Sequence, residues 1–354
     1  MWAMPDRLTV AMVVGTPLGD GQDNLHCGVR DYSICLARAL SDSGVSVQIT
    51  APASWGVRDG LTWMRTLRQM RPDVVHLQYP SIGHRHSLLP HMLGPMGLGR
   101  HFVVSLHEHS ALPRVQRMAN MLFRATAERL VFTTSYEACK FGTTAGPVIP
   151  IGSNVPVHPG DCERDDTVLY FGQIRPNKGI EHFIALAHLS IAAGEPRRFI
   201  VIGSSPPRWH DYGRELRATA PATLHWLDDA PLATVAAVMA SATAAYLPFP
   251  DGAGLRRGSL IAALANGLPI VAPLGPSTTE SLRGVLFPAA TPEGALDQLR
   301  RLRVTPSLGR QHASLGRILV QHRDWRVIAD QHASLYRHML NARAARSNAE
   351  KVTG

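Results

Sequence analysis

Cysteine is scarce in this chain, and long apolar runs are missing from it. The four cysteines (Cys27, Cys35, Cys139 and Cys162) do not have the spacing of a metal site, and four are too few for a disulfide framework in 354 residues. No run reaches the roughly 18 apolar residues that a membrane-spanning helix needs. The first residues also show no secretory signal pattern. The sequence therefore predicts reduced cysteines and a cytoplasmic protein.

Lysine is rare as well, because only three of the 36 basic residues are lysines: Lys140, Lys178 and Lys351. A G-x-G-x-x-G fingerprint does not follow the first predicted strand, which disfavours a nicotinamide-dependent oxidoreductase. No nucleic-acid motif and no basic platform interleaved with aromatic residues is present. The net charge of +9 nevertheless favours phosphate-bearing partners. We expect a nucleotide or an anionic membrane surface, and no nucleic acid.

Short apolar runs alternate with helical patterns along most of the chain, which indicates βαβ units and parallel sheets. The predicted strands are 8–14, 45–50, 73–78, 101–106, 130–134, 148–151, 168–171, 198–202, 223–226, 244–247 and 269–272. The predicted helices are 32–43, 61–71, 114–129, 180–193, 211–218, 231–240, 258–266, 292–303 and 325–340. The fold class is therefore α/β, with two Rossmann-like doubly wound domains.

A stretch rich in Pro, Gly and Asp interrupts this alternation and marks the domain boundary. We expect an N-terminal domain at 1–155, a linker at 156–166 and a C-terminal domain at 167–322. A last helix at 323–345 is expected to return to the first domain. Two such domains would face each other across a cleft, which suits a reaction between two substrates.

The loop from Phe171 to Ile180 joins a predicted strand to the N-terminus of a predicted helix. In open α/β sheets, ligands bind at this end of the strands. Arg175 and Lys178 lie on the loop, and two cations beside a helix N-terminus suggest a phosphate site. An ordinary solvated loop is the alternative.

A second basic loop follows a later strand, from Leu247 to Ser259. Its glycines permit close backbone approach to a ligand, and its arginines have the fork geometry that fits phosphate oxygens. A serine stands at the start of the next predicted helix. The binding candidates on this loop are Asp251, Gly252, Gly254, Arg256, Arg257 and Ser259.

Three further candidates stand at the carboxyl ends of other predicted strands. His107 follows the strand at 101–106 and could bind a sugar hydroxyl or orient an acceptor. Gly28 precedes the first helix and could present backbone N–H groups to a phosphate. Gly203 begins a small-residue loop after the strand at 198–202.

Several of these segments resemble motifs of the GT-B glycosyltransferases, and in particular of the retaining glycosyltransferase family 4. Residues 171–179 (Phe-Gly-Gln-Ile-Arg-Pro-Asn-Lys-Gly) are similar to the family's donor loop, and 267–269 (Gly-Leu-Pro) to the end of its donor-site helix. The strand 73–76, the segment 105–108 and the segment 149–154 also look like family motifs. The resemblance covers roughly residues 8–340.

The resemblance assigns roles residue by residue. It implies that Arg175 and Lys178 grip the diphosphate of a sugar nucleotide and that His107 lies near the sugar. One departure concerns a pair of glutamates seven residues apart that the family usually carries. The corresponding positions fall near Gly254 and Ala262, neither of which is acidic, so the resemblance does not assign the contacts to ribose and sugar.

The implied activity is transfer of a sugar from a nucleoside-diphosphate sugar to a hydroxyl of a glycan or glycolipid, with retention of anomeric configuration. No metal and no other cofactor is expected, since Arg and Lys would stabilise the leaving diphosphate. The predicted helices at 61–71 and 114–129 are basic and amphipathic, which suggests peripheral contact with an anionic membrane. Polysaccharide biosynthesis is a setting that fits the resemblance.

Other functions stay open at the level of sequence. Another GT-B enzyme, such as a sugar-nucleotide epimerase or a phosphorylase, would use the same donor loop. A non-catalytic sugar-nucleotide-binding subunit is a second alternative, suggested by the missing glutamates. The base and sugar of the donor and the identity of the acceptor are not indicated.

Overall fold

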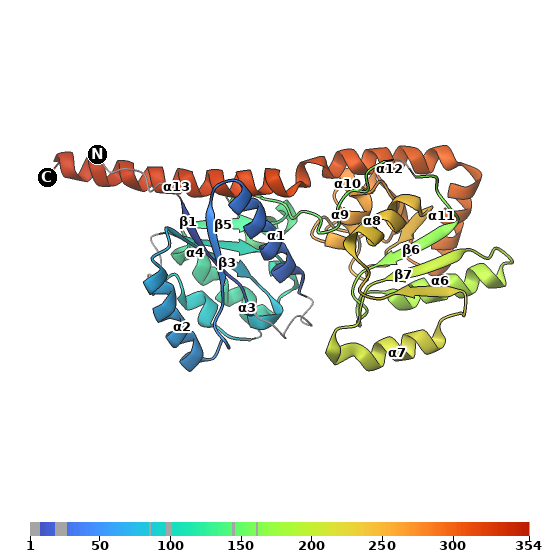
Figure 1. Ribbon diagram of the computed structural model, residues 1–354, viewed down its shortest axis with the longest axis horizontal. Coiled ribbons are helices and arrows are strands. Elements are labelled where there is room, and N and C mark those ends of the chain that lie inside the picture. The colour runs from blue at the N-terminus through green and yellow to red at the C-terminus, as the bar shows by residue number, and fades with distance from the viewer. Residues whose placement is uncertain are drawn as a thin grey trace. The chain divides into compact units, whose positions relative to one another are not determined.

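The computed structural model describes residues 8–17, 27–84, 86–96, 101–143, 146–160 and 162–353, with only the backbone described for residues 343, 344 and 346–353. The chain divides into two compact units, one formed by residues 1–152 with 323–354 and the other by residues 153–322. Each unit contains one parallel sheet with helices packed against it (Figure 1). The predicted α/β class with two parallel-sheet domains is confirmed.

The first unit contains a five-stranded sheet in the order β2-β1-β3-β4-β5, and all neighbouring strands are parallel. Its strands are β1 (Thr9–Val13), β2 (Ser46–Thr50), β3 (Val74–Tyr79), β4 (His101–Leu106) and β5 (Arg129–Phe132). Every residue of β3 and β4 is buried, as is typical of central strands in a sheet that is covered on both faces.

Helices cover both faces of this sheet because successive strand side chains point to opposite sides. Helices α1 (Gly28–Asp42) and α13 (Trp325–Thr353) share one core with side chains such as Val74 and Val103. Helices α2 (Val57–Met70), α4 (Met121–Thr126) and α5 (Ser135–Phe141) share the other core with Val75 and Val104. Figure 1 shows α13 lying beside α1.

The helix predicted at 114–129 is two short helices, α3 (Arg114–Ala119) and α4, separated at Asn120. The Asn120 side chain is fully buried and is hydrogen-bonded to two histidines, with 2.9 Å from Oδ1 to His91 Nε2 and 3.0 Å from Nδ2 to His109 Nδ1. Burial of this amide fixes the direction of the chain at the break. A side chain that hydrogen-bonds in this way competes with a continuous helix.

The strand predicted at 148–151 is also wrong in extent. Val148 forms an isolated parallel bridge with Phe132, and no strand of the described chain includes residues 149–151. Pro147 precedes the bridge and Pro150 follows it. Because proline lacks an N–H group, the ladder cannot be extended through either position.

The second unit contains a six-stranded parallel sheet in the order β11-β10-β9-β6-β7-β8. Its strands are β6 (Thr167–Phe171), β7 (Arg198–Ile202), β8 (Leu224–Leu227), β9 (Ala244–Tyr246), β10 (Ile270–Ala272) and β11 (Leu286–Pro288). Its helices are α6 (Ile180–Ala192), α7 (His210–Thr219), α8 (Leu232–Ser241), α9 (Gly258–Ala265), α10 (Glu280–Arg283), α11 (Pro292–Val304) and α12 (Pro306–Val320). The single-turn 3-10 helices of the chain are η1 (Ile82–His84), η2 (Leu89–Met92), η3 (His109–Ala111), η4 (Pro207–Trp209) and η5 (Gln321–Arg323).

The core of the first unit contains a polar network that joins β3 to α13. His76 Nδ1 lies 2.6 Å from the Tyr336 hydroxyl, and His76 Nε2 lies 2.8 Å from Ser105 Oγ. The Tyr32 hydroxyl lies 3.1 Å from His332 Nε2. All five side chains are buried, so each hydrogen bond replaces one that water would otherwise make.

Burial favours the neutral form of four histidines of this unit. It lowers the pKa of His84, His107 and His332 to about 3, with neighbouring histidines adding to the effect at His84 and His332. It also places the pKa of His76 well below the ordinary value, and His332 and His107 add to this. In the unfolded chain the same histidines take up protons near pH 6.5.

We therefore expect stability to be lost as the pH falls below 6.5, because the unfolded state then binds protons that the folded state excludes. Each histidine of this set contributes up to about 1.4 kcal/mol per pH unit. Urea unfolding at steps between pH 7 and pH 5 measures the slope. The substitution His332→Gln should reduce the slope of stability against pH by up to one histidine's contribution. The control His322→Gln, at an exposed position, should leave this slope unchanged. Equal slopes for both variants would contradict the assignment.

Candidate functional site

The chain order in the second sheet places a switch point at β6. From β6 the chain adds β7 and then β8 on one side, and it later returns to place β9 on the other side of β6. The connections that leave the carboxyl ends of β6 and β9 therefore run in opposite directions. Ligands of open α/β sheets bind in the crevice at such a point.

The loop after β6 carries Arg175 and Lys178 at this edge. Ile174 fixes the loop because its side chain is fully buried and its N–H donates to the Ser204 carbonyl at 3.0 Å. Arg175 is half-buried, and its Nε donates to Gln173 Oε1 at 3.2 Å. Lys178 is also half-buried and lies two residues before α6 begins.

The loop after β9 carries the two adjacent arginines. Each carboxylate oxygen of Asp251 accepts a hydrogen bond from one of them, Oδ2 from Arg256 and Oδ1 from Arg257. The Arg257 guanidinium carbon lies 4.2 Å from the centroid of the Phe249 ring, within the range of a cation–π contact. Asp251 therefore holds the arginine pair together, a role that the sequence did not indicate.

The backbones of the loops after β6 and after β9 approach each other closely. Gly179 has a φ of +74°, and a Cβ at this position would lie 1.9 Å from the Pro248 carbonyl oxygen. Only glycine fits both the left-handed conformation and this contact. The loop with Arg175 and Lys178 thus packs directly against the loop with Arg256 and Arg257.

Charged side chains from both loops influence the pKa of Tyr170, which lies next to the end of β6. Burial raises the pKa of the Tyr170 phenol, the Glu181 carboxylate raises it further, and the guanidinium groups of Arg175 and Arg257 lower it. Two arginines from different loops therefore act on one phenol. The sequence had not marked Tyr170, since it reads as part of an apolar strand.

The remaining predicted residues of this unit lie on adjoining loops. A Cβ at Gly203, after β7, would lie 1.9 Å from the Gly172 carbonyl oxygen. Gly252 and Gly254 are buried against the loop after β10, where a Cβ would meet Gly275 Cα at 2.4 Å and Ser277 Oγ at 2.5 Å respectively. Ser259 is half-buried in the first turn of α9.

The loop after β10 is a part of this edge that sequence reasoning missed. Thr278 Oγ1 donates to the Ala253 carbonyl at 2.6 Å and accepts from the Gly275 N–H at 2.9 Å. This threonine therefore ties the loop to the arginine-bearing loop after β9. A run of Gly, Pro, Ser and Thr directly after an apolar strand was the available signal.

Gly254 and Ala262, near which the resemblance would place two glutamates, are both buried. Ala262 is 1% exposed within α9, and Gly254 is pressed against Ser277. An acidic side chain at either position would have to displace its neighbours. Asp251 is the acid that the structure places beside the arginines instead.

His107 belongs to the first unit, where it directly follows β4. Its Nε2 lies 2.9 Å from Gln78 Oε1, and Gln78 Nε2 lies 3.2 Å from His76 Nε2. The ring also contacts Tyr32 edge-on, with centroids 4.8 Å apart. Because burial lowers the pKa of His107 to about 3, the imidazole is neutral and can exchange hydrogen bonds without carrying charge.

Gly28 is the first residue of α1 and is exposed. No side chain caps this helix, since Cys27 stands at the N-cap position. Residues 18–26 of the loop that leads to it lie outside the described residues.

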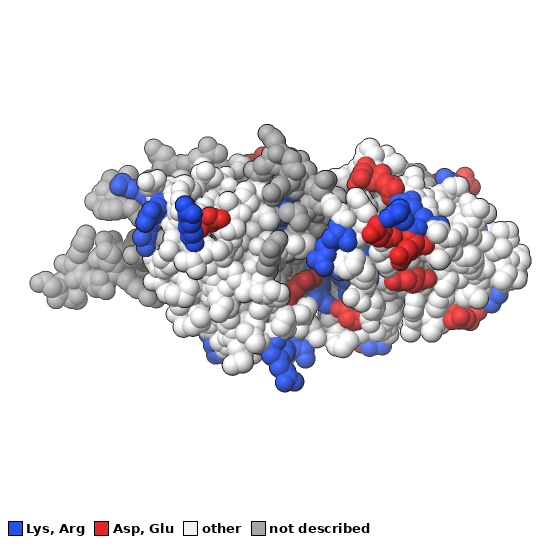
Figure 2. All heavy atoms as spheres, turned by 90° about the horizontal axis from the view of Figure 1, so that it is seen from below, with Lys and Arg blue, Asp and Glu red and all other residues white. Residues whose placement is uncertain are grey.

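Among the described residues, no group of three or more His, Cys, Asp or Glu side chains could hold a metal ion. No helix of that part of the chain is both long and apolar enough to cross a membrane. On the face drawn in Figure 2, Lys and Arg side chains form separate groups, several beside acidic side chains. This face therefore shows no continuous basic track among its described side chains.

Solved structures similar to this chain share its fold. Sucrose-phosphate synthase of Thermosynechococcus elongatus is 17% identical with a TM-score of 0.67, and the match covers 95% of this chain and 100% of that one. HepE of Anabaena, solved in complex with UDP and glucose, is 15% identical with a TM-score of 0.70, covering 93% and 99%. A glycosyltransferase of avilamycin A biosynthesis is 20% identical with a TM-score of 0.62, covering 94% and 98%.

Comparison with curated protein sequences gives no match. Residues 165–303 match the family model described as glycosyl transferases group 1. This segment runs from the residues before β6 to the end of α11 and includes both basic loops. The chain therefore has the GT-B fold, and most of its second unit is similar to glycosyl transferases group 1.

Proposed function

We propose that this protein transfers a sugar from a nucleoside-diphosphate sugar to a hydroxyl of a glycan or glycolipid, with retention of anomeric configuration. The observation that carries the proposal is the convergence of the two basic loops at the carboxyl edge of the second sheet. Arg175, Lys178, Arg256 and Arg257 would bind the diphosphate there. The complex of HepE with UDP and glucose supports a nucleotide sugar as the donor class.

The chemistry that this site would support is a front-face displacement. The bond between the anomeric carbon and the diphosphate oxygen breaks, and a bond from that carbon to the acceptor oxygen forms on the same face. The acceptor's proton passes to the departing phosphate oxygen. Arg175 and Lys178 would stabilise the negative charge that develops on the diphosphate, a contribution of about 2.7–4 kcal/mol for each such contact.

We assign the acceptor to the first unit, with His107 as the residue that touches the sugar or the acceptor. A neutral imidazole suits hydrogen bonding to hydroxyl groups. The network through Gln78 and His76 to Tyr336 would hold its ring in one orientation. We also propose that the enzyme is of the hexosyl type, is similar to glycosyltransferase family 4 and acts in polysaccharide biosynthesis without a metal ion.

Donor binding should depend on the loop after β6. We expect thermal shifts with one member of a panel of UDP, GDP, dTDP and ADP sugars. Lys178→Ala or Arg175→Ala should raise the dissociation constant for that donor about 10- to 100-fold, because a charge-assisted hydrogen bond contributes about 1.5–3 kcal/mol. Arg214→Ala on α7, an exposed arginine of the same unit, is the control. An undiminished shift in the loop variants would refute the assignment.

The stereochemical outcome can be measured without knowing the acceptor. With water as a slow acceptor, the first sugar released from the donor should have the donor's own anomeric configuration when followed by NMR before mutarotation. Inversion would contradict the front-face mechanism. Conversion of the donor to its epimer would favour an epimerase instead, and donor binding with no turnover on any acceptor would favour a non-catalytic subunit.

Fewer apolar side chains are available for membrane contact than the sequence pattern predicted. Trp63, Met64 and Leu67 of α2 are buried in the core of the first unit and are not available to lipid, whereas Val57 and Leu61 of the same helix are exposed. On α3 and α4, however, Val115 is 71% and Met118 is 74% exposed, and arginines of the same two helices lie nearby in sequence. We propose that α3 and α4 bind an anionic bilayer surface.

Sedimentation with vesicles of phosphatidylglycerol and of phosphatidylcholine tests this contact. The protein should partition onto the anionic vesicles, and the double substitution Val115→Ser and Met118→Ser should weaken partitioning at least about tenfold, given about 1.5–3 kcal/mol for each buried apolar side chain. The matched control is Val304→Ser with Ile318→Ser, two exposed side chains of the second unit. Equal recovery on both lipids would contradict the contact.

A further inference from the structure

A cavity of about 660 Å³ lies within the second unit at the edge of the sheet opposite to the basic loops. Four of the residues that line it directly precede strands: Asp166 before β6, Arg197 before β7, Thr243 before β9 and Pro269 before β10. The cavity therefore opens at the amino ends of the strands. Its volume is typical of sites that hold small molecules.

Arginine dominates the charged side chains of this cavity. Five arginines from four parts of the unit line it, and two carboxylates, Glu163 and Asp166, stand among them. The arginines are Arg164, Arg197, Arg303, Arg310 and Arg317. The lining therefore carries an excess of positive charge, which favours an anionic ligand.

Arg197 is the most deeply buried of the five. Its side chain is 1% exposed and pairs through one terminal nitrogen with Asp166, whose own side chain is 56% exposed. The Nε and the other terminal nitrogen of Arg197 have no hydrogen-bond partner among the described residues. A buried guanidinium group with two unsatisfied donors is unfavourable unless a ligand or water supplies acceptors.

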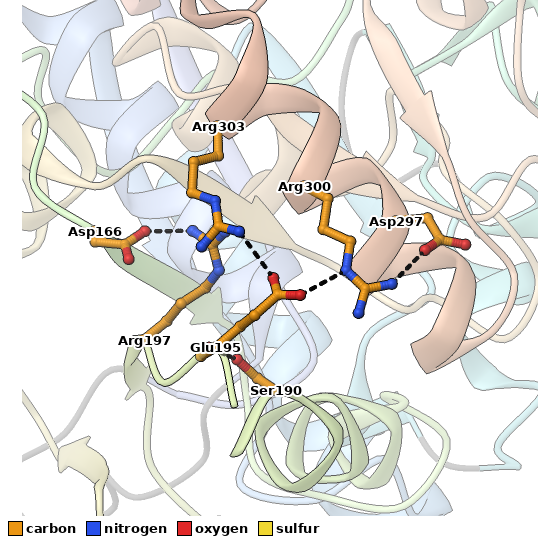
Figure 3. A network of polar contacts seen from close by, with 7 residues as sticks. All are labelled: Asp166, Ser190, Glu195, Arg197, Asp297, Arg300 and Arg303. Carbon is orange, nitrogen blue, oxygen red and sulfur yellow. Dashed lines mark hydrogen bonds and ion pairs between the residues drawn. The ribbon is translucent and has the colours of Figure 1, made fainter. Parts of the chain in front are cut away.

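Another carboxylate of this part of the unit, Glu195, is already engaged by two arginines (Figure 3). Glu195 accepts from Arg303 at 3.3 Å with one oxygen and from Arg300 at 2.9 Å with the other. Arg300 also bonds Asp297 at 2.9 Å. Glu195 thus fixes Arg303 at the cavity and leaves Arg197 with Asp166 as its counterion.

Two more arginines approach each other at Gly267. Arg164 donates to the carbonyls of Ala242 and Gly267. A Cβ added to Gly267 would lie 1.9 Å from a terminal nitrogen of Arg317, so that guanidinium lies against the same residue. Burial lowers the pKa of Arg164, and the positive charge of Arg317 lowers it further. An anion between these groups would relieve their repulsion.

We propose that this cavity is a second anion site, which binds the phosphate group of a phosphorylated small molecule. Guanidinium groups present paired donors that match phosphate oxygens. Here they come from the segment before β6, from the residue before β7 and from α11 and α12. Apolar side chains, including Ala240, Ala265, Leu302 and Ala313, line the rest of the cavity and would contact the organic part of the ligand. The proposal does not depend on the donor site.

Binding is tested on the full chain with inorganic phosphate and with glucose 6-phosphate, at constant ionic strength set by chloride. Both ligands should raise the melting temperature, and glucose 6-phosphate should act at lower concentration because it also contacts the apolar lining. Arg310→Gln with Arg317→Gln should weaken binding at least about tenfold, equivalent to about 1.4 kcal/mol. Both arginines are exposed, so the variant should fold.

The matched control removes two positive charges elsewhere in the same unit, with Arg214→Gln and Arg283→Gln, whose side chains are 78% and 50% exposed. It should bind phosphate as the unchanged protein does. If the cavity variant and the control variant respond alike, the proposal is overturned.

Chemical protection locates the ligand directly. Phosphate should slow the modification of Arg310 and Arg317 by phenylglyoxal, measured by mass spectrometry of their peptides. This protection should persist in Lys178→Ala, which separates the cavity from the proposed donor site. Protection that is absent, or that disappears with Lys178→Ala, would show that phosphate binds elsewhere and would overturn the proposal.

Discussion

Repulsion between like charges is the constraint that the carboxyl edge of the second sheet has to satisfy. Two basic loops meet there, and the N-termini of α6 and α9 add the positive ends of their dipoles. Asp251 offsets part of this charge by bonding to both Arg256 and Arg257. The missing side chain at Gly179 lets this loop pack directly against the Pro248 carbonyl of the other loop. The edge is therefore preorganised for an anion, because the cations are held in place before any ligand arrives.

The sequence revealed this edge because its signals are local. A cation on a short loop between a strand and a helix indicates a candidate anion site at the carboxyl edge of a parallel sheet, and a glycine at a tight turn indicates close backbone approach. Asp251 was identified only as a candidate ligand contact, since nothing in the local pattern shows that one carboxylate spans two neighbouring arginines. The loop after β10 was missed because Thr278 acts through the carbonyl of Ala253, a contact that no motif records.

Polar contacts between residues far apart in the chain could not be predicted, because no local pattern indicates which side chains will meet. His76 and Tyr336 are 260 residues apart in the chain, and Tyr32 and His332 are 300 apart. Each of these side chains alone reads as an ordinary member of a strand or a helix. The break at Asn120 is similar, since its cause is a buried amide bonded to two distant histidines. The arginine-lined cavity at the amino ends of the strands could not be predicted either. Part of its lining comes from α12, a helix that the apolar pattern did not indicate.

The position of α13 has a consequence for the order in which the protein can fold during synthesis. Its side chains, including Ile328, Ala333 and Met339, complete a core whose other members come from β1, β3, β4, β5 and α1. The ribosome therefore finishes the whole second unit before it delivers the last part of the first. Until then one face of the first sheet has only α1 of its two helices and exposes apolar surface together with His76. Residues 153–322 can close their own core earlier, so the unit that begins the chain is the last to be completed.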